Sequence, residues 1–120
     1  MKITTVLALC NEEETAKINS YIQDRYDIKL IIYKEKDYRA FLDNINSNID
    51  IILIENSIYN KLHILKEYKD KTYYNKTIII DDYRLECYKY IDDQYQLFNI
   101  FQSNYNKEQL ITWIDLANRI

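Results

Sequence analysis

The chain has 120 residues, which is enough for one domain with a single hydrophobic core and too few for two. Its formal net charge of −3 at pH 7 argues against direct binding of nucleic acid, because surfaces that bind nucleic acid are normally basic. Cys10 and Cys87 lack the spacing of a zinc site or a disulfide framework, so we expect reduced thiols in a cytoplasmic protein. No apolar run approaches the ~20 residues that cross a bilayer, so we expect no membrane partner.

Residues 3–9 form the first strand-like segment, a β-branched and apolar run that stops at Cys10. Asn11, with Glu14 three residues later, is typical of a helix N-terminus. The helix that follows is expected to bury apolar residues at helical spacing: Ile18, Tyr21, Ile22 and Tyr26.

Residues 28–33 predict a second strand, and a second helix is expected to begin near Asp37. The apolar residues of this helix recur at the spacing of one buried face: Tyr38, Phe41, Leu42 and Ile45. Residues 49–54 are an almost uninterrupted aliphatic run closed by Glu55 and Asn56. Such a run predicts a strand buried on both faces of a parallel sheet, with Glu55 at the carboxyl edge of that sheet.

The second half of the chain repeats this alternation. We expect, in order, a helix at 57–68, a polar connection at 69–75, a strand at 76–80 that stops at Asp81, a short helix at 85–91 and a weak edge strand at 97–101. The last helix is expected to start near Asn106 and to carry several apolar residues: Leu110, Ile111, Trp113, Ile114, Ala117 and Ile120.

Five strands alternating with five helices predict a single α/β domain over residues 1–120. The expected architecture is a flavodoxin-like three-layer sandwich, in which a five-stranded parallel sheet has the order 2-1-3-4-5. In such a sheet the carboxyl ends of the first, third and fourth strands lie side by side. We therefore expect the turn of Cys10, Asn11 and Glu12 to face Glu55 and Asp81.

The order and spacing of these segments resemble the CheY-like receiver domains of bacterial two-component response regulators. The run that ends at Glu55 resembles the approach to the family's phosphoacceptor, and residues 108–110 (Glu-Gln-Leu) resemble the start of its last helix. Asn11 precedes Glu55 by 44 residues and Asp81 precedes Ser103 by 22, as in the family, whereas the 26 residues from Glu55 to Asp81 are some four too few. The resemblance implies a fold and a signalling setting.

The resemblance also implies a role for each position, and most of these positions depart from the family's pattern. Glu55 stands at the phosphoacceptor, Asp81 at the hydroxyl switch residue, and Ile100 at the second, aromatic switch position. Ser103 stands where the family has a lysine. Cys10 and Asn11 stand where the family's acidic pair begins, after the first strand, and Glu12 is the nearest acidic residue.

Aspartyl phosphorylation needs a carboxylate at one defined reach, a divalent cation and a cationic partner for the product. Glu55 is one methylene longer than Asp and the lysine is absent, so we predict a phosphorylation-independent, non-enzymatic receiver. Glu55 then either imitates a phosphorylated Asp or is simply a solvated residue at a strand end. A conventional phosphorylatable receiver in a phosphorelay is the alternative.

Convergence of Glu12, Glu55 and Asp81 would be costly, since two like charges ~4 Å apart repel by about 4 kcal/mol near a protein surface. Splaying of the carboxylates into water or neutralisation by Arg84 is the relief we expect, with no resident metal. Binding of Mg²⁺ at Glu12 and Glu55 is the less favoured possibility.

Cys10 raises a second alternative, because the B subunits of sugar phosphotransferases carry a phosphorylated cysteine directly after their first strand. Those proteins follow the cysteine with a glycine-containing loop whose backbone amides bind phosphate. Here three glutamates follow Asn11, and they would repel phosphate. A phosphocarrier using Cys10 is therefore the minor interpretation.

Tyrosines gather in the second half of the chain, and the last helix has apolar residues beyond those that one core needs. Receivers commonly dimerise through their fourth helix, fifth strand and fifth helix, so we expect a homodimer with an interface drawn from that region: Tyr88, Ile91, Trp113, Leu116 and Ile120. The overall expectation is a dimerisation and protein-interaction module that regulates a linked output domain, most plausibly of a transcriptional regulator.

Overall fold

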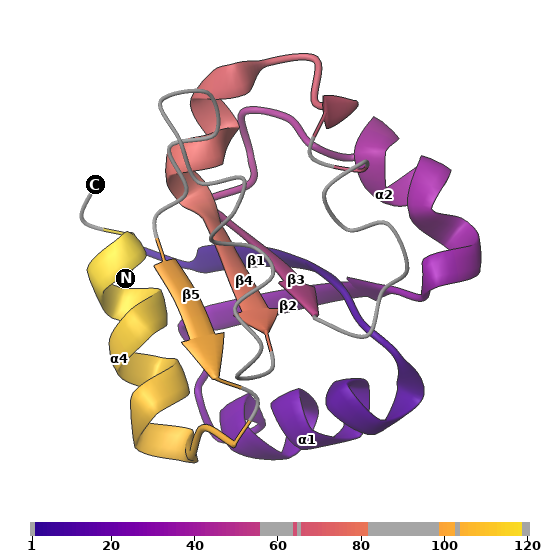
Figure 1. The fold of residues 1–120 in the computed structure, drawn as a ribbon. Helices are drawn as coiled ribbons and strands as arrows, with labels where there is room; N and C mark the ends of the chain where they lie inside the picture. The colour runs from indigo at the N-terminus through magenta and orange to yellow at the C-terminus, as the bar shows by residue number, and fades with distance from the viewer. Residues whose placement is uncertain (1, 56–63, 65, 82–98, 103, 119–120) are drawn as a thin grey trace.

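The computed structural model describes residues 2–55, 64, 66–81, 99–102 and 104–118. Five parallel strands form one sheet (Figure 1): β1 (Thr4–Leu9), β2 (Ile28–Tyr33), β3 (Ile51–Glu55), β4 (Thr77–Asp81) and β5 (Asn99–Gln102). The described helices are α1 (Glu12–Ile22), α2 (Tyr38–Asp43) and α4 (Lys107–Ala117), with two 3₁₀ segments, η1 (Glu35–Asp37) and η2 (Lys71–Lys76).

The strand order is β2-β1-β3-β4-β5, which confirms the order predicted from the sequence. Every residue of β3 is buried, as its aliphatic run predicts for a strand with covered faces. Leu9 pairs with Ile54 and Glu55 pairs with Ile80, so β1, β3 and β4 end close together at one edge of the sheet. This edge positions the candidate site.

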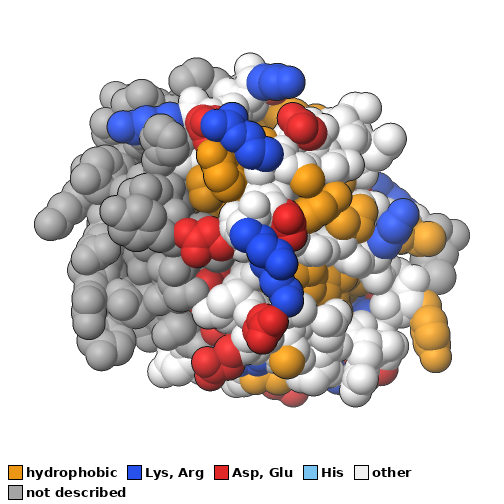
Figure 2. Space-filling view, turned by 90° about the vertical axis from the view of Figure 1, so that its right-hand side faces the viewer, with side chains coloured by type: hydrophobic (Ala, Val, Ile, Leu, Met, Phe, Trp, Pro, Cys, Tyr) orange, Lys and Arg blue, Asp and Glu red, His pale blue; other side chains and the backbone are white. Residues whose placement is uncertain are grey.

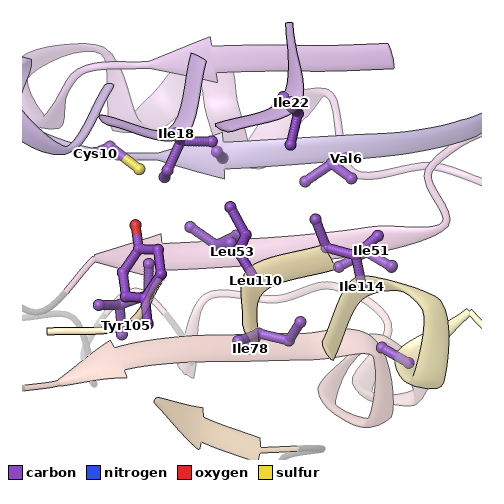
Figure 3. Packing of buried hydrophobic residues seen from close by; sticks show 13 residues of the cluster. Val6, Cys10, Ile18, Ile22, Ile51, Leu53, Ile78, Tyr105, Leu110 and Ile114 are labelled. Carbon is purple, nitrogen blue, oxygen red and sulfur yellow. The ribbon is translucent and has the colours of Figure 1, made fainter. Parts of the chain in front are cut away.

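Two hydrophobic clusters show that the sheet is covered on both faces. One cluster joins β1, β3 and β4 to α1 through Ile18 and Ile22, and to α4 through Leu110, Ile114 and Ala117 (Figure 3). The other joins the opposite face to Phe41 of α2 and to Ile64 and Tyr68. The alternation of side chains along each strand produces this division, and it gives the predicted three-layer arrangement.

Helix α1 starts where the sequence predicts and ends earlier. The side chain of Asn11 accepts a hydrogen bond from the Glu14 amide and so caps the helix. The expectation that Tyr26 extends the buried stripe is wrong, because α1 ends at Ile22 and Tyr26 is 87% exposed. Arg25 donates two hydrogen bonds to Asp27, which fixes the turn into β2 instead of another turn of helix.

Helix α2 buries the predicted face, with Phe41 fully enclosed and three partly buried neighbours against the same cluster: Tyr38, Leu42 and Ile45. The segment expected as a polar connection differs from the prediction, since residues 71–76 form the 3₁₀ segment η2. Asp70 accepts hydrogen bonds from the amide and hydroxyl of Thr72, and Thr77 donates to the carbonyl of Tyr73, so local side chains hold these turns.

Helix α4 begins with a reciprocal capping box between Asn106 and Gln109. It buries three of its predicted core residues: Leu110, Ile114 and Ala117. Several expectations lie outside the described residues, namely most of the helix at 57–68, the helix at 85–91 and the side chains of Cys87, Arg84 and Ile120.

Candidate functional site

The candidate site lies at the carboxyl edge of the sheet, where β1 and β3 end beside each other. Glu55, the last residue of β3, is only 2% exposed. The side-chain amide of Asn11 donates a 3.2 Å hydrogen bond to Glu55 Oε1, while Asn11 Oδ1 accepts the 2.8 Å bond from the Glu14 amide. The sequence prediction that Asn11 and Glu55 meet is confirmed, but the idea of Glu55 as a solvated strand-end residue is wrong.

Cys10 directly follows β1 and is completely buried. Burial raises the pKa of its thiol well above the usual value, and the negative charges of Glu55 and Glu14 raise it further. The thiol is therefore neutral at physiological pH, and it packs in the cluster beneath α1 (Figure 3). The effect of the Glu55 charge on the pKa of Cys10 agrees with the expectation that the turn of Cys10 faces Glu55.

Glu12 is largely exposed and directs its carboxylate at Lys34, whose Nζ lies 2.7 Å from Glu12 Oε1. This hydrogen bond lowers the pKa of Glu12 and raises that of Lys34. Lys34 follows β2, which borders β1 on the side opposite β3. Glu12 is therefore drawn away from the strand that carries Glu55, as splaying predicts, but toward a lysine that the sequence analysis did not consider.

Tyr105 is a site residue that the sequence analysis missed. It follows β5, is 5% exposed, and donates a 2.8 Å hydrogen bond from its hydroxyl to Glu14 Oε2. Tyr21 meets its ring edge-on at 5.9 Å between ring centroids, and Lys17 Nζ lies 3.8 Å from the ring centroid. Burial raises the pKa of Tyr105 strongly, and the bond to Glu14 adds to the shift.

One sequence signal could have identified the burial of Tyr105. An apolar residue directly before a helix N-cap commonly packs against the fourth residue of the helix. Tyr105 precedes the N-cap Asn106, and both Tyr105 and Leu110 belong to the same buried cluster. The hydroxyl contact to Glu14, across 91 residues of sequence, has no such local signal.

The remaining predicted positions are located only by their backbone. Asp81 ends β4 and pairs with Gln102, and Ile100 pairs with Ile79 within the sheet. Asp81 therefore ends its strand at the same edge as Glu55, as predicted. Ser103 and three of the candidate interface residues lie outside the described part of the chain: Tyr88, Ile91 and Ile120.

The acidic residues described at this edge do not fit a divalent metal. Asn11 contributes an amide donor where the resemblance places a carboxylate, and Lys34 neutralises Glu12. Within residues 2–55, 64, 66–81, 99–102 and 104–118, no group of three or more His, Cys, Asp or Glu side chains is close enough to hold a metal ion. None of the helices in these ranges is long and apolar enough to cross a membrane.

No protein-family model matches the sequence, and no curated protein matches it. Solved structures do match the fold. A response regulator receiver domain protein from Clostridium thermocellum aligns with a TM-score of 0.77 at 17% identity, covering 98% of this chain and 95% of that one. A CheY-like response regulator from Mesorhizobium loti aligns with a TM-score of 0.67 at 8% identity, covering 97% of this chain and 99% of that one.

The pilus assembly protein CpaE from Caulobacter crescentus also aligns, with a TM-score of 0.63 at 14% identity, covering 95% of this chain and 92% of that structure. The strand order and these likenesses define the class: the chain has the CheY-like fold of response regulator receiver domains. At these identities the likeness establishes the fold and leaves the activity to be argued from the site.

Proposed function

We propose that this chain is an atypical receiver domain that acts without phosphorylation, as a regulatory dimerisation and protein-interaction module. The observation that carries the proposal is the buried carboxylate of Glu55 in a hydrogen bond with the amide of Asn11. Two more of the glutamates described at this edge have partners within the chain, since Glu12 pairs with Lys34 and Glu14 accepts from Tyr105.

These contacts oppose phosphoryl transfer for a chemical reason. A carboxylate that attacks a phosphoryl group must be accessible, and a cation must neutralise the oxygens of the incoming group. Glu55 is almost fully buried, and Lys34 is committed to Glu12. Phosphorylation of Glu55 would also place new negative charge among Glu12, Glu13 and Glu14.

The contacts also disfavour a phosphocarrier that uses Cys10. A nucleophilic cysteine needs thiolate at physiological pH, and such cysteines lie in electropositive, accessible surroundings. Burial and the charges of Glu55 and Glu14 raise the pKa of Cys10 instead.

The surface of α4 supports a protein partner. Leu116 is 40% exposed on this helix, and Trp113 packs partly against the chain's own core, so that only part of its ring is available to another molecule. Figure 2 shows the side of the molecule that lies to the right in Figure 1, away from α4, and there positive and negative side chains are interspersed. That side therefore lacks the continuous basic surface that binding of nucleic acid needs. We propose a homodimer through the face of α4, with any output in a linked domain.

Transcription is the output that we favour for such a linked domain. The likeness to a pilus assembly protein indicates that the fold is not confined to transcriptional regulators.

Incubation with acetyl phosphate and Mg²⁺, followed by intact-protein mass spectrometry, tests the proposal. We expect no gain of a phosphoryl group, while a receiver with the usual aspartate gains one in the same reaction. Glu55→Gln is the matched control, since it keeps the shape of the side chain and removes the nucleophile. A gain in the wild-type protein that disappears in Glu55→Gln would overturn the proposal.

A further inference from the structure

The hydrogen bonds at the N-terminus of α1 form an unbroken chain between Glu55 and the start of α4. Glu55 Oε1 accepts from Asn11 Nδ2 at 3.2 Å, and Asn11 Oδ1 accepts from the Glu14 amide at 2.8 Å. Glu14 Oε2 then accepts from the Tyr105 hydroxyl at 2.8 Å. Tyr105 directly precedes Asn106, the residue that caps α4. Each link therefore shares a residue with the next.

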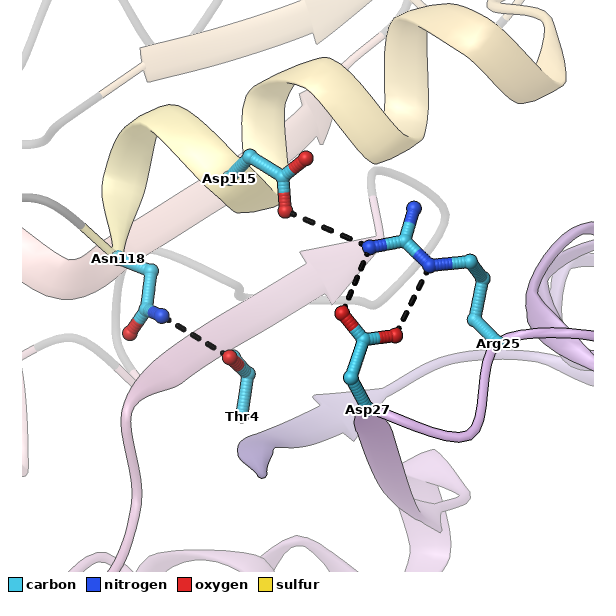
Figure 4. A network of polar contacts seen from close by, with 5 residues as sticks. All are labelled: Thr4, Arg25, Asp27, Asp115 and Asn118. Atoms are coloured by element: carbon cyan, nitrogen blue, oxygen red, sulfur yellow. Dashed lines mark hydrogen bonds and ion pairs between the residues drawn. The ribbon is translucent and has the colours of Figure 1, made fainter. Parts of the chain in front are cut away.

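Further contacts attach α4 to the turn that follows α1 and to β1. At the other end of α4, Asp115 lies 3.8 Å from Arg25 and Asn118 donates a 2.9 Å hydrogen bond to Thr4 (Figure 4). Near its start, Lys107 pairs with Asp24 at 2.8 Å. The turn after α1 therefore helps to position α4, while Tyr105, directly before the cap of α4, is bonded to Glu14 in the first turn of α1.

The Tyr105 link is the strongest of these attachments on physical grounds. The exposed pair of Lys107 and Asp24 lies in water, where ion pairs contribute little. Tyr105 is almost entirely buried, its hydroxyl lies toward the side of the cluster that holds Cys10 and Ile18 (Figure 3), and its ring packs against Tyr21. A hydrogen bond in such surroundings is costly to break, because a buried donor that loses its acceptor finds no water.

We infer that this chain of bonds is a relay that couples the side chain at position 55 to the position of α4, through α1. The relay runs on the side of β1 and α1 and does not pass through β4, where Asp81 holds the position of the switch residue. It rests on the proposed function, because it states how an unphosphorylated Glu55 holds the helix that carries the interaction face. Amide exchange reports on the relay and mass spectrometry on phosphorylation, so the two can fail separately.

A double-variant cycle tests the relay in the full chain. Glu55→Ala removes the first acceptor, and Tyr105→Phe removes the last donor while keeping the ring. Native-state hydrogen exchange of the amides at 108–111 is the readout. We expect Glu55→Ala to accelerate this exchange about tenfold in the wild-type background, and less than about twofold when Tyr105 is already Phe. An equal acceleration in both backgrounds would overturn the relay.

Two controls keep the result interpretable. Exchange at Leu53 reports global opening, so the ratio of the α4 rate to the Leu53 rate is the quantity compared. Tyr26→Phe removes a hydroxyl from a residue that is 87% exposed, and it should leave the effect of Glu55→Ala unchanged.

If Glu55→Ala does not fold, Asn11→Ser replaces it, because serine preserves the helix cap and ends short of Glu55. The same non-additivity with Tyr105→Phe is expected, and additivity would again overturn the relay.

Discussion

The amide of Asn11 and the carboxylate of Glu55, 44 residues apart in sequence, are joined by a 3.2 Å hydrogen bond at the carboxyl edge of the sheet. Receiver domains have an acidic residue near the position of Asn11, and two carboxylates there would attract a cation. In this chain a neutral amide donates to Glu55 instead. The replacement of one oxygen by nitrogen at position 11 thus changes a repulsive pair into an attractive one.

Asn11→Asp tests this account of the pair. Aspartate caps helices as well as asparagine, so the cap to Glu14 survives, but its carboxylate repels Glu55. We expect the free energy of unfolding at pH 7 to fall by about 1–3 kcal/mol and to recover partly as the pH is lowered and the carboxyls become protonated. Urea denaturation at pH 7 and pH 5 measures both effects. Asn11→Ser serves as the control, and an equal loss at the two pH values in Asn11→Asp would contradict the repulsion.

Tyr105 predicts a loss of stability in alkaline solution. Burial first, and then the bond to Glu14, raise the pKa of Tyr105 above its usual 10.0, so the folded chain holds the phenol proton more tightly than the unfolded chain. Tyr105 makes its full contribution to the free energy of unfolding below about pH 10. Above that pH the contribution falls, because the unfolded state releases a proton that the folded state retains.

Tyr105→Phe should cost about 1 kcal/mol at pH 7 and should flatten the alkaline decline. Denaturant titrations between about pH 8 and about pH 11, a range that brackets the usual phenol pKa, measure the slope. Tyr26→Phe is the matched control, because that ring is exposed. A decline as steep in Tyr105→Phe as in the wild-type chain would show that another group causes it.

Cys10 should react slowly with thiol reagents in the folded protein. Burial, reinforced by the charges of Glu55 and Glu14, raises the pKa of its thiol above the usual 9.0. Little thiolate therefore exists near pH 8, and the sulfur is covered as well. In a Cys87→Ser background, labelling by a disulfide reagent should be at least about tenfold slower than in urea. Labelling as fast in the folded protein as in urea would revive the phosphocarrier hypothesis.

The sequence predicts the fold well because the signals that specify it are local and periodic. The buried run before Glu55 and the strand ends at Cys10 and Asp81 fix which edge carries the polar residues. The partners of those residues are less predictable. Lys34 and Tyr105 each lie on a different element from the glutamate they contact, and many other side chains of the same type offer equivalent chemistry.

Local hydrogen bonds explain the errors in element boundaries. Asp70 and Thr72 hold turns of 3₁₀ helix in a segment whose composition is that of a loop, and the fork between Arg25 and Asp27 ends α1 before Tyr26. Such bonds involve polar residues, whereas hydrophobic periodicity reports only apolar ones.

The exposed side chain of Leu116 predicts that the chain self-associates through α4. It is 40% exposed on α4, and its helix is held in place by contacts to α1 and the turn before β2, so the face is preorganised for a partner. Sedimentation of the wild-type protein at tens of micromolar should give a dimer. Leu116→Glu should shift it to the monomer, since a charge at an apolar contact loses its hydration without gaining a partner. Ile3→Glu is the control, because Ile3 is also exposed, at 52%, but lies before β1. A wild-type monomer, or a dimer insensitive to Leu116→Glu, would exclude this face as the interface.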